Sequence, residues 1–324
     1  MTFKRRLLVG MALAALAVSA WAQNENWPSK PIRLIVTFPP GGSSDAAARI
    51  VAPRLAERLG QAVVVDNRPG AGGGVGLDLA AKSPGDGYTI VLASAGGLTA
   101  NPSLYSRLSY DPVKDFAPIT LFGTSPFVLL ASSAIAASNV ADVIKLAKSQ
   151  PGRLSYASGG NGTAMHLSGE LLKSMAGVSI LHIPYRGSGP ALMAVMAGET
   201  QLAVADITTV APQIKSGRIK VLGVLGKSRS SMAPDIPSLN ESGLPGYDAS
   251  GWFGILAPAS TPPAIVQRLN TELTAVLRSP EIRERFASAW LEPLPSTSEE
   301  MAALMKSETT KWARVIKESG ASVD

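Results

Sequence analysis

Two glycine-rich turns are the parts of this sequence best suited to bind a small molecule. The turn at residues 38–45 follows an apolar run, the turn at 158–163 follows a short strand pattern, and a helical pattern follows each. The first N–H groups of a helix are unpaired and carry about half a positive charge, and glycine allows a ligand close to the backbone. The turns therefore predict a site for a carboxylate or phosphate without lysine or arginine. Either turn alone would equally suit an ordinary helix N-cap.

Polar side chains in these turns add candidate ligand contacts. The hydroxyls of Ser43, Ser44 and Thr163 could add hydrogen-bond donors at the two helix starts. Asp45 could accept a hydrogen bond from a ligand ammonium, hydroxyl or water. As an acid in the first turn of a helix it would equally complement the helix dipole, and we slightly favour that structural role.

Further candidates lie within or after predicted strands and helices. Arg186, in the turn at residues 185–187, could clamp a carboxylate, although a solvated loop arginine is the commoner case. Asp206 ends a strand and could equally be an ordinary loop acid. His166 falls in a helical pattern and His182 in a strand, so we expect hydrogen bonding and packing from them rather than proton transfer.

Groups that carry out reactions are scarce. The chain has no Cys and 2 His, which excludes thiol nucleophiles, zinc ribbons and iron–sulfur clusters and disfavours a multi-histidine metal site. It contains no G-x-S-x-G, G-x-G-x-x-G, H-E-x-x-H or EF-hand motif. We therefore predict a binding protein with no cofactor, no metal and no catalytic residue. A periplasmic hydrolase or isomerase is the least favoured alternative, because it needs a base and a nucleophile in contact.

The elements that must position these residues alternate between strand and helix. An apolar run at 32–38 precedes a helix that should end at Leu59 with Gly60 after it, and strands are expected at 62–65 and 88–93. This βαβαβ order predicts a parallel sheet with helices on its faces.

A second set of elements repeats the plan. Strands are expected at 127–131, 154–157, 180–183 and 202–205 with helices between them, then at 219–225 and 252–257, and a terminal helix is expected at 298–318. In open α/β sheets, ligands bind at the carboxyl ends of the strands. Two lobes facing each other would therefore aim two helix N-termini into one cleft.

The first 22 residues have the pattern of a cleavable secretory signal. Three basic residues at 4–6 precede an apolar run at 7–20 and a small-x-small site at 20–22. The run is shorter than the ~20 residues of a membrane span, and the absence of Cys excludes a lipid anchor at the cleavage site. We expect a soluble, unlipidated protein exported to a bacterial periplasm.

Composition and charge further restrict the class of protein and the partners that this sequence can have. The full sequence of 324 residues, signal included, is 46% hydrophobic and 17% charged. Its length suits one large domain or two lobes, and its composition is too apolar for a disordered chain. Cleavage of the signal would lower the net charge from +6 to +3. No basic stripe interleaved with aromatic residues remains, so we predict no nucleic-acid partner.

Five stretches together resemble a known family. They are Trp27-Pro28 with Lys30-Pro31-Ile32, the turn at 38–45, the run Val63 to Gly73, Asp86-Gly87-Tyr88-Thr89, and His182 to Gly187. In this combination and order, the chain is similar to the exported substrate-binding proteins of tripartite tricarboxylate transporters, the Bug family. The Asn-Arg-Pro-Gly-Ala-Gly-Gly run within the third stretch is the most specific match.

The resemblance implies a fold, a function and partners. The fold would be an α/β periplasmic binding protein fold of type II, in which two lobes close on the ligand in the manner of a Venus flytrap. Residues 23–126 and 248–324 would form lobe 1, and residues 127–247 lobe 2. The protein, expected as a monomer, would be a non-enzymatic receptor that delivers a small carboxylate or its amide to the membrane subunits of a transporter. A ligand-sensing receptor for a periplasmic sensor kinase is the alternative.

The resemblance also extends the set of expected cleft residues. Both turns line the cleft in the family, the first partly through ordered water, and Ser94 follows a strand where relatives often contact ligand. In this chain Ala95-Gly96-Gly97 comes next, where many relatives are more polar. The predicted ligand-binding residues are Phe38, Pro40, Gly41, Gly42, Ser43, Asp45, Ser94, Ser158, Gly159, Asn161, Gly162, Thr163, His166, Tyr185, Arg186, Gly187 and Asp206.

The signal pattern yields a direct test. Because Ala20-Trp21-Ala22 precedes polar Gln23, the mature protein should begin at Gln23 and have no lipid attached. Intact-mass measurement of the protein from the periplasmic fraction checks this expectation, and a mass that includes residues 1–22 would contradict it.

Overall fold

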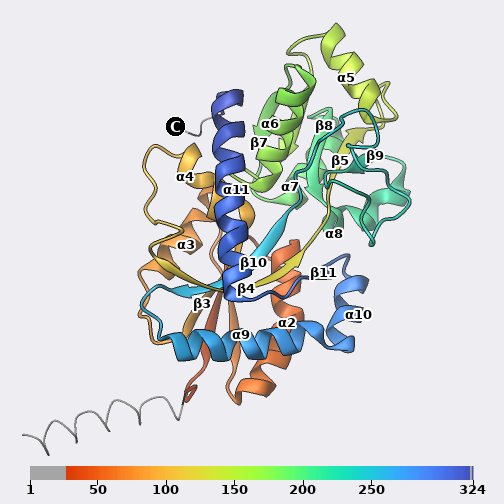
Figure 1. Cartoon of the computed structure of the whole chain (residues 1–324). Coiled ribbons are helices and arrows are strands. Elements are labelled where there is room, and N and C mark those ends of the chain that lie inside the picture. Colours follow the sequence, from red (N-terminus) through yellow and green to blue (C-terminus); the bar gives the residue numbers. More distant parts are fainter. Residues whose placement is uncertain (1–26, 322, 324) are drawn as a thin grey trace, which may run out of the picture.

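The computed structural model describes residues 27–321 and residue 323, so the predicted signal lies outside the described residues. Two β-sheets, each flanked by helices, form two lobes that lie one above the other (Figure 1). In the described part of the chain, no helix is long and apolar enough to cross a membrane.

The first sheet has six strands in the order β11-β4-β10-β3-β1-β2. Its parallel part confirms the predicted βαβαβ arrangement, because β1 pairs in parallel with β2 and with β3. The antiparallel strands β4, β10 and β11 complete it, and of these the sequence predicted only β10. The strands are β1 (Ile32–Val36), β2 (Val63–Asn67), β3 (Thr89–Ser94), β4 (Phe116–Thr124), β10 (Trp252–Pro258) and β11 (Glu292–Pro293).

The second sheet has five strands in the order β7-β6-β8-β5-β9. Strand β6 pairs in parallel with β7 and β8, whereas β5 pairs antiparallel with β8 and β9. The strands are β5 (Phe127–Ser132), β6 (Ser155–Ser158), β7 (Leu181–Pro184), β8 (Leu202–Asp206) and β9 (Ile219–Val224). The chain passes from the first sheet to the second between β4 and β5 and returns between β9 and β10.

Helices cover the sheets, and several of them begin just after the carboxyl end of a strand. As predicted, α2 ends at Leu59, and Gly60 follows with a φ of 71° that glycine adopts without strain. The helices of the first lobe are α2 (Ser43–Leu59), α3 (Gly74–Ala81), α4 (Asn101–Leu104), α9 (Pro263–Arg278) and α10 (Pro280–Ser288). Those of the second lobe are α5 (Val140–Ser149), α6 (Ala164–Ala176), α7 (Ser188–Ala197) and α8 (Ile207–Val210).

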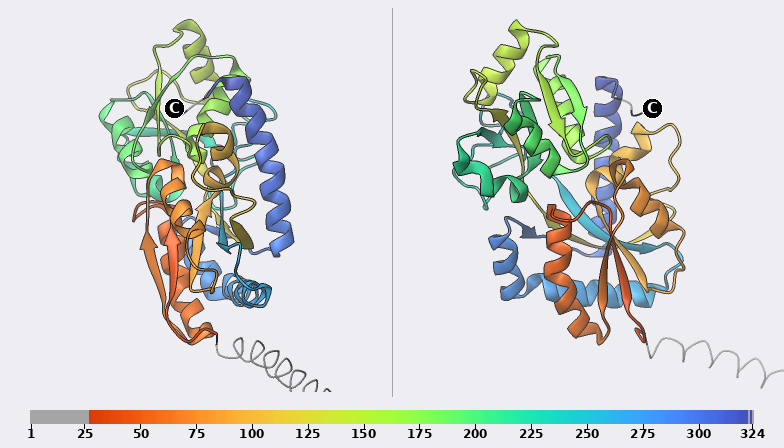
Figure 2. Two further views of the ribbon diagram at one scale, coloured as in Figure 1. Left: turned by 90° about the vertical axis from the view of Figure 1, so that its left-hand side faces the viewer. Right: turned by 180° about the vertical axis from the view of Figure 1, so that it is seen from behind.

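The C-terminal helix α11 (Ser298–Ser319) is shared between the lobes. It runs along one side of both (Figure 2) and contacts β4 below and α6 above. Met301 packs in the core of the first lobe, whereas Trp312 and Ile316 pack in the core of the second. The predicted lobe 1 therefore includes a helix whose last turns lie among the buried residues of the other lobe.

A buried polar cluster supports the turn at residues 158–163 in the second lobe. The Ser158 hydroxyl lies 2.6 Å from His182 Nε2, and the His182 ring stacks on His166 with 4.0 Å between ring centroids. His166 Nδ1 accepts a hydrogen bond from the backbone N–H of Gly162 at 3.3 Å. The hydrogen bonding and packing that the sequence predicted for the two histidines are therefore present.

Both histidines are neutral at pH 7. Burial lowers the pKa of His166 to about 4. Burial and the neighbouring His166 lower the pKa of His182 to about 3. A His whose folded pKa lies below the unfolded value of 6.5 stabilises the fold fully above pH 6.5, and this contribution is lost as the pH falls towards the folded pKa.

We therefore expect the free energy of unfolding to fall between pH 7 and pH 5. For His166 alone the loss at pH 5 is about 2 kcal/mol, because the unfolded state is protonated there and the folded state is not. Urea unfolding at several pH values measures it, and His166→Gln should show a shallower pH dependence. An equal slope in the wild-type and variant proteins would contradict this account.

Candidate functional site

A cavity of about 140 Å³ lies between the two lobes. Residues that follow β1, the last residue of β3 and the first two residues of β10 line it from the first sheet. The first residue of β5, the last residue of β8 and residues that follow β6, β7 and β8 line it from the second. It lies at the carboxyl ends of the parallel strands of both sheets, where ligands bind in open α/β folds.

Three helices begin at this cavity. The first N–H groups of a helix have no intrahelical partner, and in α2, α6 and α7 the return bonds start only at Ala46, Leu167 and Ala191. The earlier positions Ser43, Ser44, Ala164, Met165, Ser188 and Gly189 line the cavity. Converging helix starts make the cavity electropositive although its lining holds one basic residue, Arg186, which is solvent-exposed.

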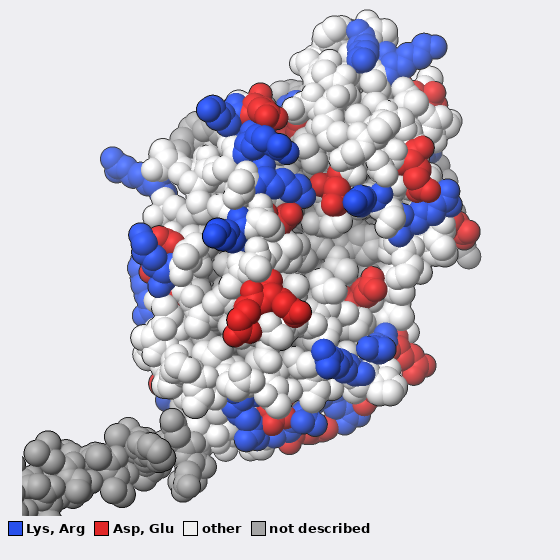
Figure 3. Space-filling model, in the orientation of Figure 1, with Lys and Arg blue, Asp and Glu red and all other residues white. Residues whose placement is uncertain are grey.

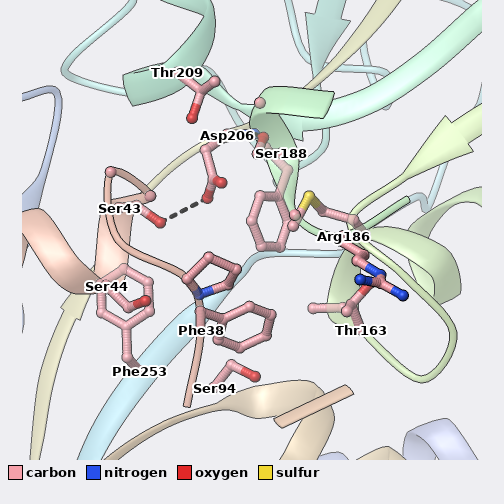
Figure 4. Close-up of a pocket in the computed structure, with 18 of the residues that line it drawn as sticks. Phe38, Ser43, Ser44, Ser94, Thr163, Arg186, Ser188, Asp206, Thr209 and Phe253 are labelled. Atoms are coloured by element: carbon pink, nitrogen blue, oxygen red, sulfur yellow. Dashed lines mark hydrogen bonds between the residues drawn. The ribbon is translucent and has the colours of Figure 1, made fainter. Parts of the chain in front are cut away.

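A hydrogen bond joins the lobes at the edge of this cavity. Ser43 Oγ, at the start of α2, donates to Asp206 Oδ1, at the end of β8, with 2.7 Å between the oxygens (Figure 4). The backbone N–H of Asp206 donates to Ser188 Oγ at 2.9 Å. Burial raises the pKa of the Asp206 carboxyl, which is 5% exposed and forms no ion pair with another described residue.

Three lining residues have buried polar atoms without a hydrogen-bond partner among the described residues. These atoms are Ser94 Oγ, Thr209 Oγ1 and the indole Nε1 of Trp252. Buried polar groups are rarely left unpaired in native proteins, because each costs about 1–3 kcal/mol. The three atoms therefore indicate that a polar ligand or ordered water completes the site.

The remaining wall of the cavity is apolar. Four aromatic residues, Phe38, Phe127, Trp252 and Phe253, line it, together with Met165 and three prolines. The volume is close to the ~150 Å³ of an engineered protein cavity that binds benzene. A ligand with about six carbon atoms, apolar in its middle and polar at its ends, fits this combination of walls.

A second cavity of about 640 Å³ adjoins the first. Phe38, Pro39, Thr163, Arg186 and Gly187 line both. The glycine-rich loop at residues 69–73, the turn at 159–161 and Val323 near the C-terminus line only the larger one. Arg186 therefore lies where the two spaces meet.

The predicted ligand-binding residues fall into three groups by position. Those that line the smaller cavity are Phe38, Pro40, Gly41, Gly42, Ser43, Ser94, Thr163, Arg186, Gly187 and Asp206. Gly159, Asn161 and Tyr185 line only the larger cavity. Asp45, Ser158, Gly162 and His166 line neither cavity.

The four residues outside both cavities hold the turns in place. The Asp45 carboxylate accepts hydrogen bonds from the Gly41 N–H at 3.0 Å, from Arg49 at 2.9 Å and from Asn67 at 3.0 Å. Burial alone would raise the pKa of Asp45, but these bonds hold the pKa below its usual value. This is the structural role that the sequence slightly favoured. Ser158, Gly162 and His166 belong to the histidine cluster behind the second turn.

Several lining residues were not predicted. Ser188 was within reach of sequence reasoning, because it begins the helix that follows the predicted turn at 185–187. Trp252 and Phe253 had no such signal, because β10 returns to the first sheet after the whole second lobe and pairs antiparallel with β3. Phe127, Met165 and Thr209 are apolar or hydroxyl residues that sequence alone does not distinguish from core positions.

The site offers binding groups and little that could carry out a reaction. The Ser158–His182 contact is the kind of pair that a hydrolase needs, but Ser158 is fully buried and lines neither cavity. In the described part of the chain, no group of three or more His, Cys, Asp or Glu could hold a metal ion. The face in Figure 3 shows basic and acidic residues interspersed, without one extended basic surface.

Comparison with known proteins agrees with this arrangement. Residues 47–321 match the family model described as "Tripartite tricarboxylate transporter family receptor". A Pseudomonas sp. (strain P51) relative, the UPF0065 protein in the tcbD-tcbE intergenic region, is 40% identical, with 97% of this chain and 94% of the relative covered. Protein BugT of Bordetella pertussis is 35% identical, with 98% and 97% covered.

Solved structures agree in fold. The R. palustris protein Rpa4515, solved with adipate, has a TM-score of 0.87 and 34% identity over 91% of this chain and 99% of that protein. The periplasmic binding protein BugD has a TM-score of 0.84 and 34% identity over 91% and 99%. These matches confirm the predicted two-lobed periplasmic binding protein fold and the resemblance found in the sequence. The chain belongs to the family of tripartite tricarboxylate transporter receptors, and its role is solute binding.

Proposed function

We propose that this protein is a periplasmic receptor that captures a small carboxylate, or its amide, between its lobes and delivers it to the membrane subunits of a tripartite tricarboxylate-type transporter. The observation that carries the proposal is the convergence of three helix N-termini on one cavity with a single, exposed basic side chain. Such a site stabilises a carboxylate through oriented N–H groups and needs no buried basic side chain.

Two relatives support the ligand class. Rpa4515 was solved with adipate, and MatC of Rhodopseudomonas palustris, at 29% identity and a TM-score of 0.83, was solved with bound malate. Both ligands are small carboxylates. The unpaired atoms of Ser94, Thr209 and Trp252 give the present cavity further polar positions to hold such a molecule.

The mechanism follows from the division of the site between two lobes. A ligand whose polar groups form hydrogen bonds with both lobes gains most of these bonds only when the lobes are together. Ligand binding therefore favours the closed arrangement, and the membrane subunits recognise that arrangement. A sensor-kinase receptor would use the same cavity, and pull-down with the cognate membrane subunits separates the two roles.

A panel of C3–C8 carboxylates and their amides should contain a ligand. A compound at ~100 times its dissociation constant stabilises the folded state by about 2.7 kcal/mol, a rise in melting temperature of roughly 5 °C for a protein of this size. Thermal-shift assays on ligand-stripped protein, with mass spectrometry of any retained molecule, test this. If only a neutral sugar or a peptide gives the shift, the ligand class is wrong.

Closure of the lobes can be tested at Gly96, which lines neither cavity. A Cβ at Gly96 would lie 2.7 Å from Ala164 N and 2.9 Å from Gly162 O, backbone atoms of the opposite lobe. We expect Gly96→Ala to weaken binding of any ligand found above by about tenfold or more, equal to 1.4 kcal/mol. Isothermal titration calorimetry measures the loss.

Gly97→Ala is the matched control. Its Cβ would meet the flexible Leu77 side chain at 2.9 Å, within the same lobe, so it tests local crowding without affecting closure. Equal affinities for the two variants would contradict a binding mechanism that requires this close contact of the lobes.

A further inference from the structure

The ends of the smaller cavity differ in charge, and this difference restricts the ligand beyond its being a carboxylate. Asp206 and Thr209 lie at one end and Ser94 at the opposite end, with Thr163 and Arg186 to one side (Figure 4). Arg186 and Asp206 are the only charged residues among the described residues that line this cavity. A ligand carboxylate therefore belongs towards Ser94, Thr163 and Arg186, away from Asp206.

The Asp206 end disfavours a second carboxylate. The elements around Asp206 present Ser43 from α2, Ser188 from α7 and Phe127 from β5, none of which is titratable. The nearest acid on α2, Asp45, is bound to Arg49 and lies outside the lining. Two carboxylates in hydrogen-bond contact cannot both be ionised, so a ligand carboxylate at Asp206 must bring a proton with it.

A neutral group that both donates and accepts suits this end. The carboxylate of Asp206 has about four acceptor positions and accepts hydrogen bonds from Ser43 (Figure 4), from Ser188 and from its own backbone N–H, so room remains for a ligand donor. The Thr209 hydroxyl, buried and unpaired, can donate to an oxygen beside it. A carboxamide offers N–H groups to the first and a carbonyl oxygen to the second.

The middle of the cavity favours a flat, apolar body. Phe127, Trp252 and Phe253 are each at least nine-tenths buried, and with Phe38 they are the four aromatic residues that line a space of about 140 Å³. Aromatic rings pack against one another by stacked or edge-to-face contacts that a flexible chain does not make. A short polyhydroxylated acid would leave these walls without apolar contact.

We propose that this receptor selects a six-membered-ring carboxylate whose far side bears a neutral hydrogen-bonding group, a carboxamide in the best case, and that Asp206 is the residue that rejects a second carboxylate. This inference rests on the proposed function and adds to it the class of ligand. Asp206 thus acts as the specificity-determining residue of the cavity.

Four probe compounds separate the two parts of the proposal. The ring pair is 4-carbamoylbenzoate and terephthalate, and the chain pair is adipamate and adipate; within each pair the compounds match in size and differ in the charge of one end. We expect 4-carbamoylbenzoate to bind the full-length mature protein most tightly at pH 7.5. In each pair the affinity for the amide should exceed the affinity for the dicarboxylate by about tenfold or more. The reason is that a carboxyl group that must bind protonated loses a factor of ten in affinity for each unit by which the pH exceeds its pKa.

Asp206→Asn is the decisive variant, since it removes the charge and keeps the shape. The ratio of amide to dicarboxylate affinity should fall to about one or below. This ratio is measured within one protein, so a general loss of stability does not affect it. An unchanged ratio would overturn the role of Asp206, and tighter binding of adipamate than of 4-carbamoylbenzoate would overturn the flat-body requirement.

Proton uptake on ligand binding tests the same inference with the wild-type protein alone. Calorimetry in buffers of different ionisation enthalpy should detect uptake of one proton with each dicarboxylate and none with each amide. Dicarboxylate binding without proton uptake, at an affinity equal to that of the amide, would overturn the inference and leave the proposed function standing. If no carboxylate and no amide binds, both this inference and the proposed function are wrong.

Discussion

Unpaired N–H groups at the starts of α2, α6 and α7 are the constraint on which the site depends. Each helix follows a strand whose carboxyl end faces the other lobe, so three positive helix ends meet in one cavity. Such ends attract an anion without a lysine or arginine, and the cost of burying a cationic side chain is avoided. Because the helix starts supply positive charge, Arg186 can remain exposed and the rest of the wall can be apolar.

Helix starts act as a binding site only if the turns before them are rigid. Asp45 ties the first turn together through the Gly41 N–H, Arg49 and Asn67, and it thereby joins α2 to the end of β2. The cluster of Ser158, His166 and His182 does the same for the second turn from within the other lobe. These side chains face away from the cavity, and they determine its shape by holding the backbone that lines it.

The connection between the lobes combines close packing with one specific polar contact. Gly96 and Gly72 lie so near the turn at 159–164 that a Cβ on either would approach its backbone within 2.7–2.8 Å. The Ser43–Asp206 hydrogen bond crosses the same boundary, and α11 contributes buried side chains to both cores. Because Asp206 takes part in this bond and also lines the cavity, the contact between lobes and the choice of ligand depend on the same carboxyl group.

Local patterns in the sequence determined much of this protein. The alternation of strands and helices, the glycine-rich turns and the family motifs predicted the fold, and ten of the predicted residues line the smaller cavity. These signals are readable because strand ends, glycine turns and helix starts are encoded by residues adjacent in the chain. Tertiary structure alone decided that Trp252 and Phe253 line the cavity, that Asp45 and His166 do not, and that Asp206 meets Ser43. The pairing of Phe253 with Ser94, the stacking of His166 on His182 and the bond from Ser43 to Asp206 join residues that are not neighbours in the chain. Residue type says nothing about which distant group a side chain will meet.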